Sequence, residues 1–382
     1  ETMATRLRVL VTLAAALLAE ACATAPAIGA PEHSVTDAPE QSVTGAWLLR
    51  QGLGQLELLL AARPIAPLLR DARVPRDLRR RLALVVAARD FARHRLGLAV
   101  GAQYRRAVFL RGPAVVYVVS AAPPDALEPV TWRYPVVGAL PYQGSFSLDD
   151  AERLAETFSA RELDVSVRPV TTYSLLGIAP DPIVSPMLYR RDELDIVETV
   201  IHELAHATVF SAGQGAFNEG LATFIGTQGR RQFVRERFGA DSAVARRSDA
   251  LDDDDDAWRR AMAALAFDLR VLFAQRGTLS GAALVEQKTA IFQRHQRHWQ
   301  DEVAPTLFSV RLRQARLPEN NAELAAVGLY SLRQHLYADA FAACGEDWRC
   351  FLSLLRTAAA APEPESSLAT ALPAPRREVD LP

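Results

Sequence analysis

The chain contains the stretch Val200-Ile201-His202-Glu203-Leu204-Ala205-His206, followed by Phe217-Asn218-Glu219-Gly220-Leu221-Ala222. On an α-helix, residues four apart lie one turn above each other, so His202 and His206 can direct both imidazoles at a single ion. Glu203 lies about 100° round the helix from His202, where it can reach a metal-bound water without ligating the metal. The pattern therefore predicts that the two histidines are metal ligands and that Glu203 is a general base.

A third ligand is expected from the segment that follows. Zinc in a catalytic site takes three protein ligands and keeps a fourth position for water, and two His with one Glu is a known set. Glu219 follows His206 after twelve intervening residues and is the expected third ligand. We predict one Zn²⁺ per chain, bound by His202, His206 and Glu219. The alternative is an exposed helix that carries these residues by chance, because short motifs also arise without function.

The local sequence predicts a helix, a turn and a second helix. Asp192 is the expected N-cap, and Ser211-Ala212-Gly213-Gln214-Gly215 breaks the first helix. Small residues at Gly220 and Ala222 would let the second helix approach the first closely, so that Glu219 faces the histidines. Apolar residues at helical spacing define the buried face of the first helix: Leu194, Val197, Ile201, Leu204, Ala205 and Thr208.

Length, charge and cysteine content limit the class of protein. A chain of 382 residues with a formal net charge of −2 allows one large or two modest domains. Arginines far outnumber lysines but are scattered among acidic residues, so the sequence shows no stripe for nucleic acid. Three cysteines exclude a disulfide scaffold. Cys344 and Cys350 can pair in an oxidising compartment with Gly345 allowing the bend, although two buried free thiols fit the spacing equally well.

The N-terminal segment carries a compartment signal. Arg6 and Arg8 precede the apolar run 9–19, which is too short to span a bilayer as a mature helix and is typical of a secretory signal. The run ends at Cys22 in a pattern similar to a bacterial lipoprotein signal; the alternative is ordinary cleavage at a later Ala-rich site. We expect a protein of the bacterial cell envelope on the periplasmic side, attached to a membrane through lipidated Cys22, or otherwise soluble in the periplasm or secreted.

The rest of the chain predicts an α+β fold that is predominantly helical, with a small mixed β-sheet before the metal-binding helix and a helical C-terminal part. We expect a signal segment at 1–22, a flexible tether at 23–44, and a disordered tail at 361–382. The domain between them, 45–360, divides into a sheet-containing part at about 105–190 and a helical part at about 191–360. Expected strands are 114–119, 136–140, 164–167 and 172–176, and a helix capped by Ser147 with Asp150 runs to about Arg161.

Five consecutive aspartates, Asp252 to Asp256, precede Trp258, which is expected to open a helix. Calcium loops alternate their acidic residues with others and contain a glycine, and this run does neither. We therefore interpret the aspartates as a solvated helix N-terminus favoured by the helix dipole.

These motifs resemble those of the bacterial zinc aminopeptidases, often lipoproteins, within the gluzincin-like metallopeptidases that add a glutamate ligand to His-Glu-x-x-His. The resemblance extends from about Gly45 to Arg356 and departs from the family at Arg133 and Ala139, where Cys often stands, and at Gly220 and Leu221, where Ser and Phe are usual. Besides the metal motif, it is carried by 54–59, 89–92, 132–138, 142–146, 173–177, 181–182, 217–219, 320–322 and Tyr330.

The resemblance implies a zinc-dependent peptidase acting on peptide substrates, with ligands His202, His206 and Glu219 and with Glu203 catalytic. The oxyanion that forms at the carbonyl needs a donor. Tyr330 is our candidate and His335 the second, although Tyr330 can equally be an aromatic residue at the edge of the core. Asp181 and Glu198 are candidates to bind a free α-ammonium group. The alternatives are an envelope endopeptidase or other amide hydrolase, and a non-catalytic zinc-binding envelope lipoprotein.

Overall fold

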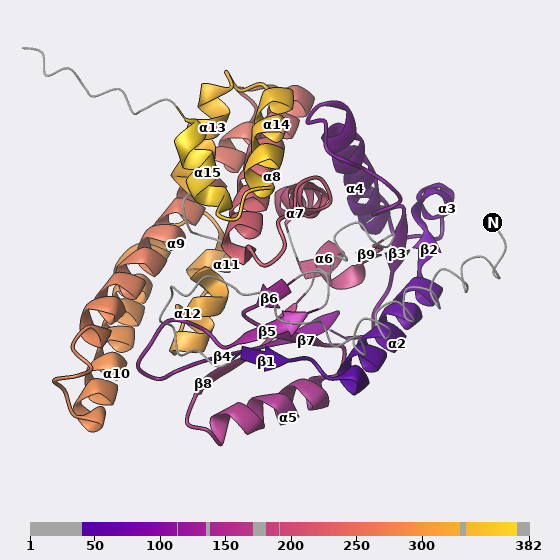
Figure 1. Cartoon of the computed structure of the whole chain (residues 1–382). Coiled ribbons are helices and arrows are strands. Elements are labelled where there is room, and N and C mark those ends of the chain that lie inside the picture. Colours follow the sequence, from indigo (N-terminus) through magenta and orange to yellow (C-terminus); the bar gives the residue numbers. More distant parts are fainter. Residues whose placement is uncertain are drawn as a thin grey trace, which may run out of the picture.

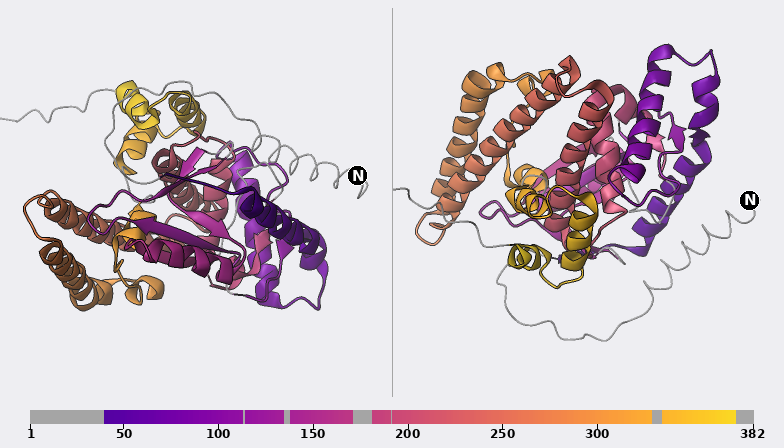
Figure 2. Two further views of the ribbon diagram at one scale, coloured as in Figure 1. Left: turned by 60° about the horizontal axis from the view of Figure 1, so that its bottom comes forward. Right: turned by 90° about the horizontal axis from the view of Figure 1, so that it is seen from above.

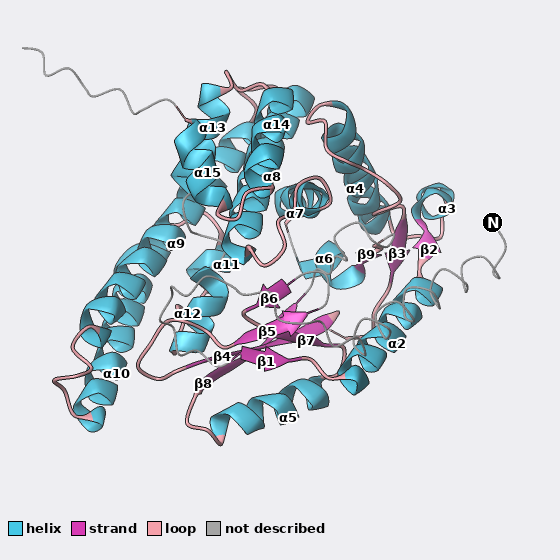
Figure 3. Cartoon of the chain, viewed as in Figure 1, coloured by secondary structure: helices cyan, strands magenta, loops and turns pink. Residues whose placement is uncertain are grey.

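The computed structural model describes residues 40–112, 114–134, 138–170, 181–190, 192–328 and 334–372. Long helices surround small sheets, which is the α+β fold predicted from the sequence (Figure 3). The signal segment, Cys22, the expected strand 172–176 and Tyr330 lie outside the described residues. None of the helices in the described part of the chain has the length and apolarity needed to cross a bilayer.

The strands form three sheets of three strands each, with orders β1-β5-β6, β2-β3-β9 and β7-β4-β8. Of the strands expected to share one mixed sheet, β4 and β8 pair with each other, whereas β6 pairs with β5 in a separate sheet. Helix α5 packs on β4 and β8, and so does α12. The strands are β1 Glu40–Ser42, β2 Arg63–Pro64, β3 Arg106–Val108, β4 Val116–Ala122, β5 Thr131–Tyr134, β6 Gly138–Leu140, β7 Gln143–Ser145, β8 Asp164–Val170 and β9 Ile183–Val184.

The helices form the larger part of the molecule (Figure 1). Side-chain oxygens accept from the first turn at several N-termini, as expected for Ser, Thr and Asp caps: Thr44, Ser147, Asp192, Ser242, Ser280 and Asp347. The helices are α2 Gly45–Ala61, α3 Ile65–Arg70, α4 Arg76–His94, α5 Leu148–Ser159, α6 Ser185–Arg190, α7 Glu193–His206, α8 Gly215–Phe238, α9 Ala243–Phe273, α10 Gly281–His298, α11 Val310–Arg313, α12 Asn321–Gly328, α13 Gln334–Ala343, α14 Trp348–Ala359 and α15 Pro364–Ala371.

The main hydrophobic core surrounds α7, which packs against α4 and α8. A second cluster fills the space between α9, α10 and the segment that follows them, with Trp299 fully buried. The α9–α10 pair lies at one side of the molecule and α2, α3 and α4 lie at the other (Figures 1 and 2). Helix α7 is therefore held in the interior from several directions.

Ordered structure extends beyond the boundaries expected from composition. Strand β1 lies in the expected tether and pairs in parallel with β5, with Glu40 opposite Thr131. Helix α15 lies in the segment expected to be a disordered tail. Its Leu368 is fully buried in the main core, and Pro364 occupies the first turn, where a missing N–H costs nothing. Both segments are short, and each contacts a distant part of the chain, β1 through its pairing with β5 and α15 through Leu368.

The aspartate run does not start a helix. Helix α9 begins at Ala243, nine residues earlier, where Ser242 accepts from Ala245 N. Asp252 is buried and pairs with Arg230 and Arg231 of α8. Asp254 is buried as well and accepts from the backbone N–H groups of Phe308 and Ser309. The interpretation of a solvated N-terminus was wrong because these carboxylates have partners on other segments.

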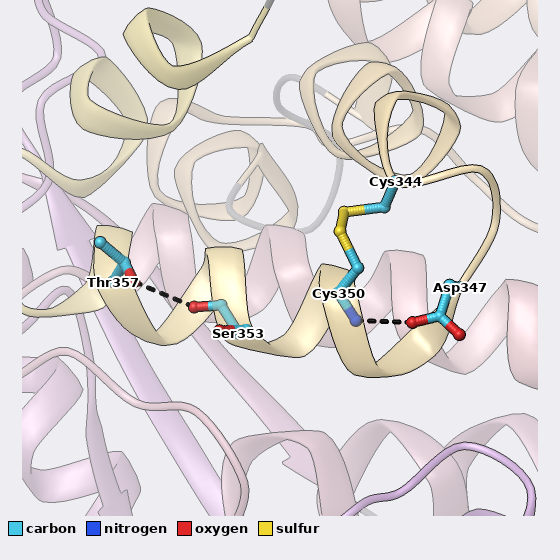
Figure 4. The surroundings of a disulfide bond; sticks show 5 residues. All are labelled: Cys344, Asp347, Cys350, Ser353 and Thr357. Atoms are coloured by element: carbon cyan, nitrogen blue, oxygen red, sulfur yellow. Dashed lines mark hydrogen bonds between the residues drawn. A yellow bond between two sulfur atoms is a disulfide. The ribbon is translucent and has the colours of Figure 1, made fainter.

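Cys344 and Cys350 form a disulfide, with their Cα atoms 5.6 Å apart (Figure 4). Gly345 follows Cys344 with φ of 63°, a backbone conformation that glycine adopts without strain. Asp347 accepts from Cys350 N and caps α14. The pairing, which the sequence left open, therefore joins the end of α13 to the start of α14.

Candidate metal centre

Helix α7 carries the two histidines and is fixed by its cap and its apolar face. Asp192 Oδ1 accepts from Leu194 N at 3.0 Å, as the sequence predicts for the N-cap. The expected apolar face is buried from Leu194 to Ala205. Thr208 is half-buried, donates to Leu204 O at 2.6 Å and accepts from Ala99 N at 2.9 Å. The rotation of α7 about its axis is thus determined, and with it the direction of both imidazoles.

The turn between α7 and α8 is held by a side chain. Asn218 Oδ1 accepts from Ser211 N at 2.8 Å, and Asn218 Nδ2 donates to Ser211 O at 2.7 Å. Asn218 is buried, and this pair of bonds closes the turn in the way that two paired backbone groups would. Glu219 is the next residue. These two hydrogen bonds therefore fix the first turn of α8 relative to α7, and with it the position of Glu219.

Helix α8 approaches α7 through glycines other than the one expected. A Cβ atom at Gly226 would lie 3.2 Å from His202 Cβ, and one at Gly229 would lie 2.9 Å from Ile201. A Cβ at Gly220 would meet the ring of Tyr337 on α13 at 2.7 Å. The expectation that Gly220 faces α7 was wrong because that side of α8 packs on α13. The close approach occurs two turns further along α8.

The three candidate ligand side chains meet at one point. The Nε2 atoms of His202 and His206 lie 3.1 Å apart. Glu219 Oε2 lies 3.4 Å from His202 Nε2, and Glu219 Oε1 lies 3.7 Å from His206 Nε2. Ligand atoms at about 2.0–2.1 Å from a tetrahedral zinc ion are roughly 3.3 Å from one another. The nitrogen and oxygen donors, their number and their separations all fit zinc.

Charge at this point is set by the carboxylate. Burial disfavours ionisation of Glu219, yet the neighbouring His206 and His202 hold the pKa of that carboxyl well below its usual range. Burial disfavours the charged form of His206, but the Glu219 carboxylate raises the pKa of that imidazole. The carboxylate therefore stays ionised, as a metal ligand must, and favours positive charge where the three side chains meet. Within the described residues, no fourth His, Cys, Asp or Glu joins this group.

Two tyrosines that we did not identify from the sequence lie in the electrostatic field of the centre. Burial raises the pKa of Tyr142, and the carboxylates of Glu219 and Glu203 add to the effect. Burial likewise raises the pKa of Tyr104, with Glu203 and Asp181 acting in the same direction. Tyr104 has φ of 57°, which is uncommon for a residue other than glycine. Tyr142 lies in one of the segments that carry the family resemblance, 142–146, but no role was predicted for it.

Tyr142 lies in the connection between β6 and β7, which belong to different sheets. Gly138, at the start of β6, packs so closely on the α7–α8 turn that a Cβ atom would lie 2.8 Å from Gly213 N. Tyr134 Oη, at the end of β5, donates to Tyr142 O at 2.8 Å and ties this connection to β5. The sheet region thus contributes to the site through a loop, which periodicity in the sequence does not reveal.

The remaining candidates occupy other positions. His335 is exposed on α13 and does not join the metal-ligand group. Glu198, one turn before His202, accepts from Arg230 Nε at 2.7 Å and from Thr227 Oγ1 at 3.1 Å. Its carboxylate therefore belongs to a buried ion pair that links α7 to α8. Asp181 is buried, and its backbone carbonyl accepts from Tyr104 N at 2.8 Å.

Comparison with known proteins adds one finding to this geometry. A family model described as "Putative aminopeptidase" matches residues 46–369. The chain belongs to this aminopeptidase family. No curated protein and no solved structure matches the chain. The match covers nearly all of the described residues and ends within α15, and it identifies the aminopeptidase family to which the sequence motifs pointed.

Proposed function

We propose that the chain is a zinc-dependent aminopeptidase of one Zn²⁺ per chain, held by His202, His206 and Glu219. The observation that carries the proposal is the convergence of these three donors at separations of 3.1, 3.4 and 3.7 Å. Three protein ligands leave one position of a tetrahedral ion for water, whereas structural zinc sites are closed by four. The donor set therefore favours a catalytic site over the alternative of a non-catalytic zinc-binding lipoprotein.

When bound, zinc would polarise the scissile carbonyl and lower the pKa of a water molecule toward neutrality. Glu203 is the neighbour of His202 on α7 and lies outside the ligand group. We assign to its carboxylate the removal of a proton from the attacking water and the delivery of that proton to the leaving amine. The proton taken from water therefore ends on the amino group that is released when the peptide C–N bond breaks.

A hydrogen-bond donor for the developing oxyanion is assigned to a tyrosine. Tyr330 remains our candidate from the sequence. Tyr142 is a second candidate, because its neutral phenol lies in the field of both Glu219 and Glu203. Loss of one oxyanion donor costs roughly 10²–10³ in kcat. Comparing Tyr142→Phe with Tyr330→Phe therefore assigns the role to the variant that loses kcat by this factor while its zinc content is unchanged.

The decisive experiment is to measure zinc content and peptide hydrolysis for the wild type and Glu203→Gln. We expect equal zinc content and a loss of kcat by a factor of at least about 10² in the variant, since a general base contributes roughly 10²–10⁴. Glu193→Gln, in the first turn of α7, is the matched control. Equal hydrolysis by Glu203→Gln and wild type would exclude the mechanism.

Peptides with free and acetylated N-termini separate the proposed activity from its closest alternative. An aminopeptidase binds the free α-ammonium group and cleaves only the unblocked peptide. An envelope endopeptidase, or another amide hydrolase, cleaves both. Equal rates on the two peptides would retain the metal chemistry and reject the aminopeptidase assignment.

We also propose that the protein acts in the bacterial cell envelope, on the periplasmic side, attached through lipidated Cys22. The Cys344–Cys350 disulfide supports this location, because such bonds persist in oxidising compartments. Labelling of cells with a radioactive fatty acid tests the anchor, and Cys22→Ser should abolish incorporation.

A further inference from the structure

Helix α2 exposes a row of leucines on its outer face. Leu49, Leu53 and Leu60 are 55%, 53% and 73% exposed, and Leu56 between them is half-buried. Their spacing of four, three and four residues places all four within roughly 60° of one another on an α-helix. Large apolar side chains gathered in this way mark a surface that contacts another body. We call Leu49, Leu53, Leu56 and Leu60 the leucine face.

The opposite face of α2 is the one that packs on the protein. Trp47 Nε1 donates to Gly144 O at 3.0 Å, and Leu58 is buried in the main core. The ring of Phe146 lies so close to Gly54 that a Cβ atom there would overlap it. These contacts fix the rotation of α2. Because the side of α2 that carries Trp47, Gly54 and Leu58 packs on the protein, the leucine face points away from the core.

The region around the leucine face is strongly basic. Residues 45–95 contain eleven arginines and only four acidic residues, whereas the whole chain has a net charge of −2. Exposed arginines follow α2 directly in the chain, at Arg63, Arg70, Arg73 and Arg76. Helices α2, α3 and α4 lie together at one side of the molecule, opposite α9 and α10 (Figure 2). Several of these arginines pair with carboxylates, among them Arg73 with Asp71 and Arg80 with Glu193, whereas Arg63, Arg70 and Arg76 are exposed on β2, α3 and the start of α4.

We propose that the leucine face of α2, together with the exposed Arg63, Arg70 and Arg76, docks on an anionic lipid bilayer. Leucine on an interfacial helix enters the boundary of the acyl chains while basic residues contact anionic head groups. A second copy of the chain fits less well. The leucine face offers roughly a few hundred Å², well below the roughly 800 Å² per partner of a stable dimer. A second copy would also bring two basic regions together.

A local probe tests this docking in the full chain. Leu53→Cys, in a Cys22→Ser background, carries an environment-sensitive fluorophore, since the remaining two cysteines are paired in a disulfide. Val285→Cys is the matched control, because it is 50% exposed on α10 at the opposite side of the molecule. Vesicles are phosphatidylcholine alone, or phosphatidylcholine with phosphatidylglycerol. We expect a blue shift at position 53 with anionic vesicles, little shift with neutral vesicles, and none at position 285.

Changing the arginines supplies the second measurement. Arg63→Gln with Arg70→Gln should weaken binding to anionic vesicles by about tenfold or more, because each basic residue near such a surface adds several-fold to partitioning. Far-ultraviolet circular dichroism melts establish that each variant is folded. Leu60→Cys replaces Leu53→Cys if the latter fails to fold.

Each other outcome overturns the proposal. A shift at position 53 that grows with protein concentration without vesicles indicates a second copy of the chain as the occupant. A probe already blue-shifted in the monomer and unaffected by vesicles indicates that another segment of this chain covers the leucine face. Equal shifts at 53 and 285, or no shift at 53 while the protein floats with the vesicles, rejects docking through α2.

Discussion

Glu219 Oε2 lies 3.4 Å from His202 Nε2, although the two residues are seventeen positions apart in the chain. They come from different helices, and the two hydrogen bonds between Asn218 and Ser211 hold the turn that brings these helices together. The contact closes a group in which every donor atom lies within 4.8 Å of the others. A site made by two helices in this way depends on the turn as much as on the ligands.

Removal of the third ligand should release the metal. We expect Glu219→Ala to lower zinc affinity by more than the roughly 10–100-fold that changes outside the ligand set cause. Chelation should lower the midpoint of thermal unfolding of the wild type, because a metal that binds only the folded state stabilises it. Zinc titration monitored by isothermal calorimetry measures the affinity, and thermal unfolding with and without chelator measures the midpoint. Glu203→Gln is the control, and equal zinc affinity in Glu219→Ala would contradict the assignment.

Packing of α8 on α13 gives a second prediction. Gly220→Ala should destabilise the protein by about 1–3 kcal/mol, because the new methyl group meets the buried Tyr337 ring and overpacks the core. Gly215→Ala, at the start of the same helix, has nothing within 4 Å and should be neutral or slightly stabilising. Urea unfolding of both variants provides the comparison. Equal stabilities would show that α13 does not pack on α8 at Gly220.

The third prediction concerns the buried ion pairs of Arg230. Arg230 is 1% exposed and pairs with Glu198 and Asp252, so Arg230→Ala leaves Glu198 without its cation and Asp252 with Arg231 alone, and it should cost about 3–5 kcal/mol. Arg235→Ala removes an exposed pair with Asp249 and should cost at most about 1 kcal/mol. Chemical denaturation distinguishes them. Similar losses for both variants would mean that the Arg230 network contributes no more than a surface pair.

Asp255 predicts a pH dependence. Burial and then the nearby Glu198 raise the pKa of Asp255 from 3.8 to about 7. Ionisation is easier in the unfolded chain, so this carboxyl lowers stability progressively as pH rises from about 4 through 7. Its side chain is 35% exposed, and solvent screening limits the effect to about 1 kcal/mol.

Asp255→Asn should therefore match the wild type near pH 4 and become more stable than the wild type above pH 7. Thermal unfolding at a series of pH values gives the difference directly. Asp253→Asn, on the exposed side of α9, is the control and should show no such divergence. A constant difference across the pH range would reject the raised pKa.

The disulfide gives the last prediction. Cys344 and Cys350 are six residues apart, and closing so short a loop stabilises the folded state by about 2 kcal/mol in the chain-entropy treatment. Cys350→Ser, or reduction of the wild type, should lower the free energy of unfolding by this amount. Unfolding with and without reductant measures it. The double variant Cys344→Ser and Cys350→Ser should not respond to reductant, and a response there would place the effect elsewhere.

The sequence determined the local parts of the site. Asp192 caps α7 and the periodic apolar residues bury one face of it, so the position of His202 relative to His206 followed from helix geometry. These features depend on residues within a few turns of one another. For the same reason, the α+β class and the helix α5, capped by Ser147, could be predicted.

Only the tertiary structure decided which distant surfaces meet. It placed Gly226 and Gly229, instead of Gly220, against α7, and it divided the strands into three sheets. It also buried the side chains of Asp252 and Asp254, which lie in the middle part of α9. It brought Tyr142 toward the centre on the connection between β6 and β7, and it buried Leu368 of α15 in the main core. Such choices depend on complementary shape and charge between segments far apart in the chain, and a one-dimensional pattern does not contain the partner of each surface.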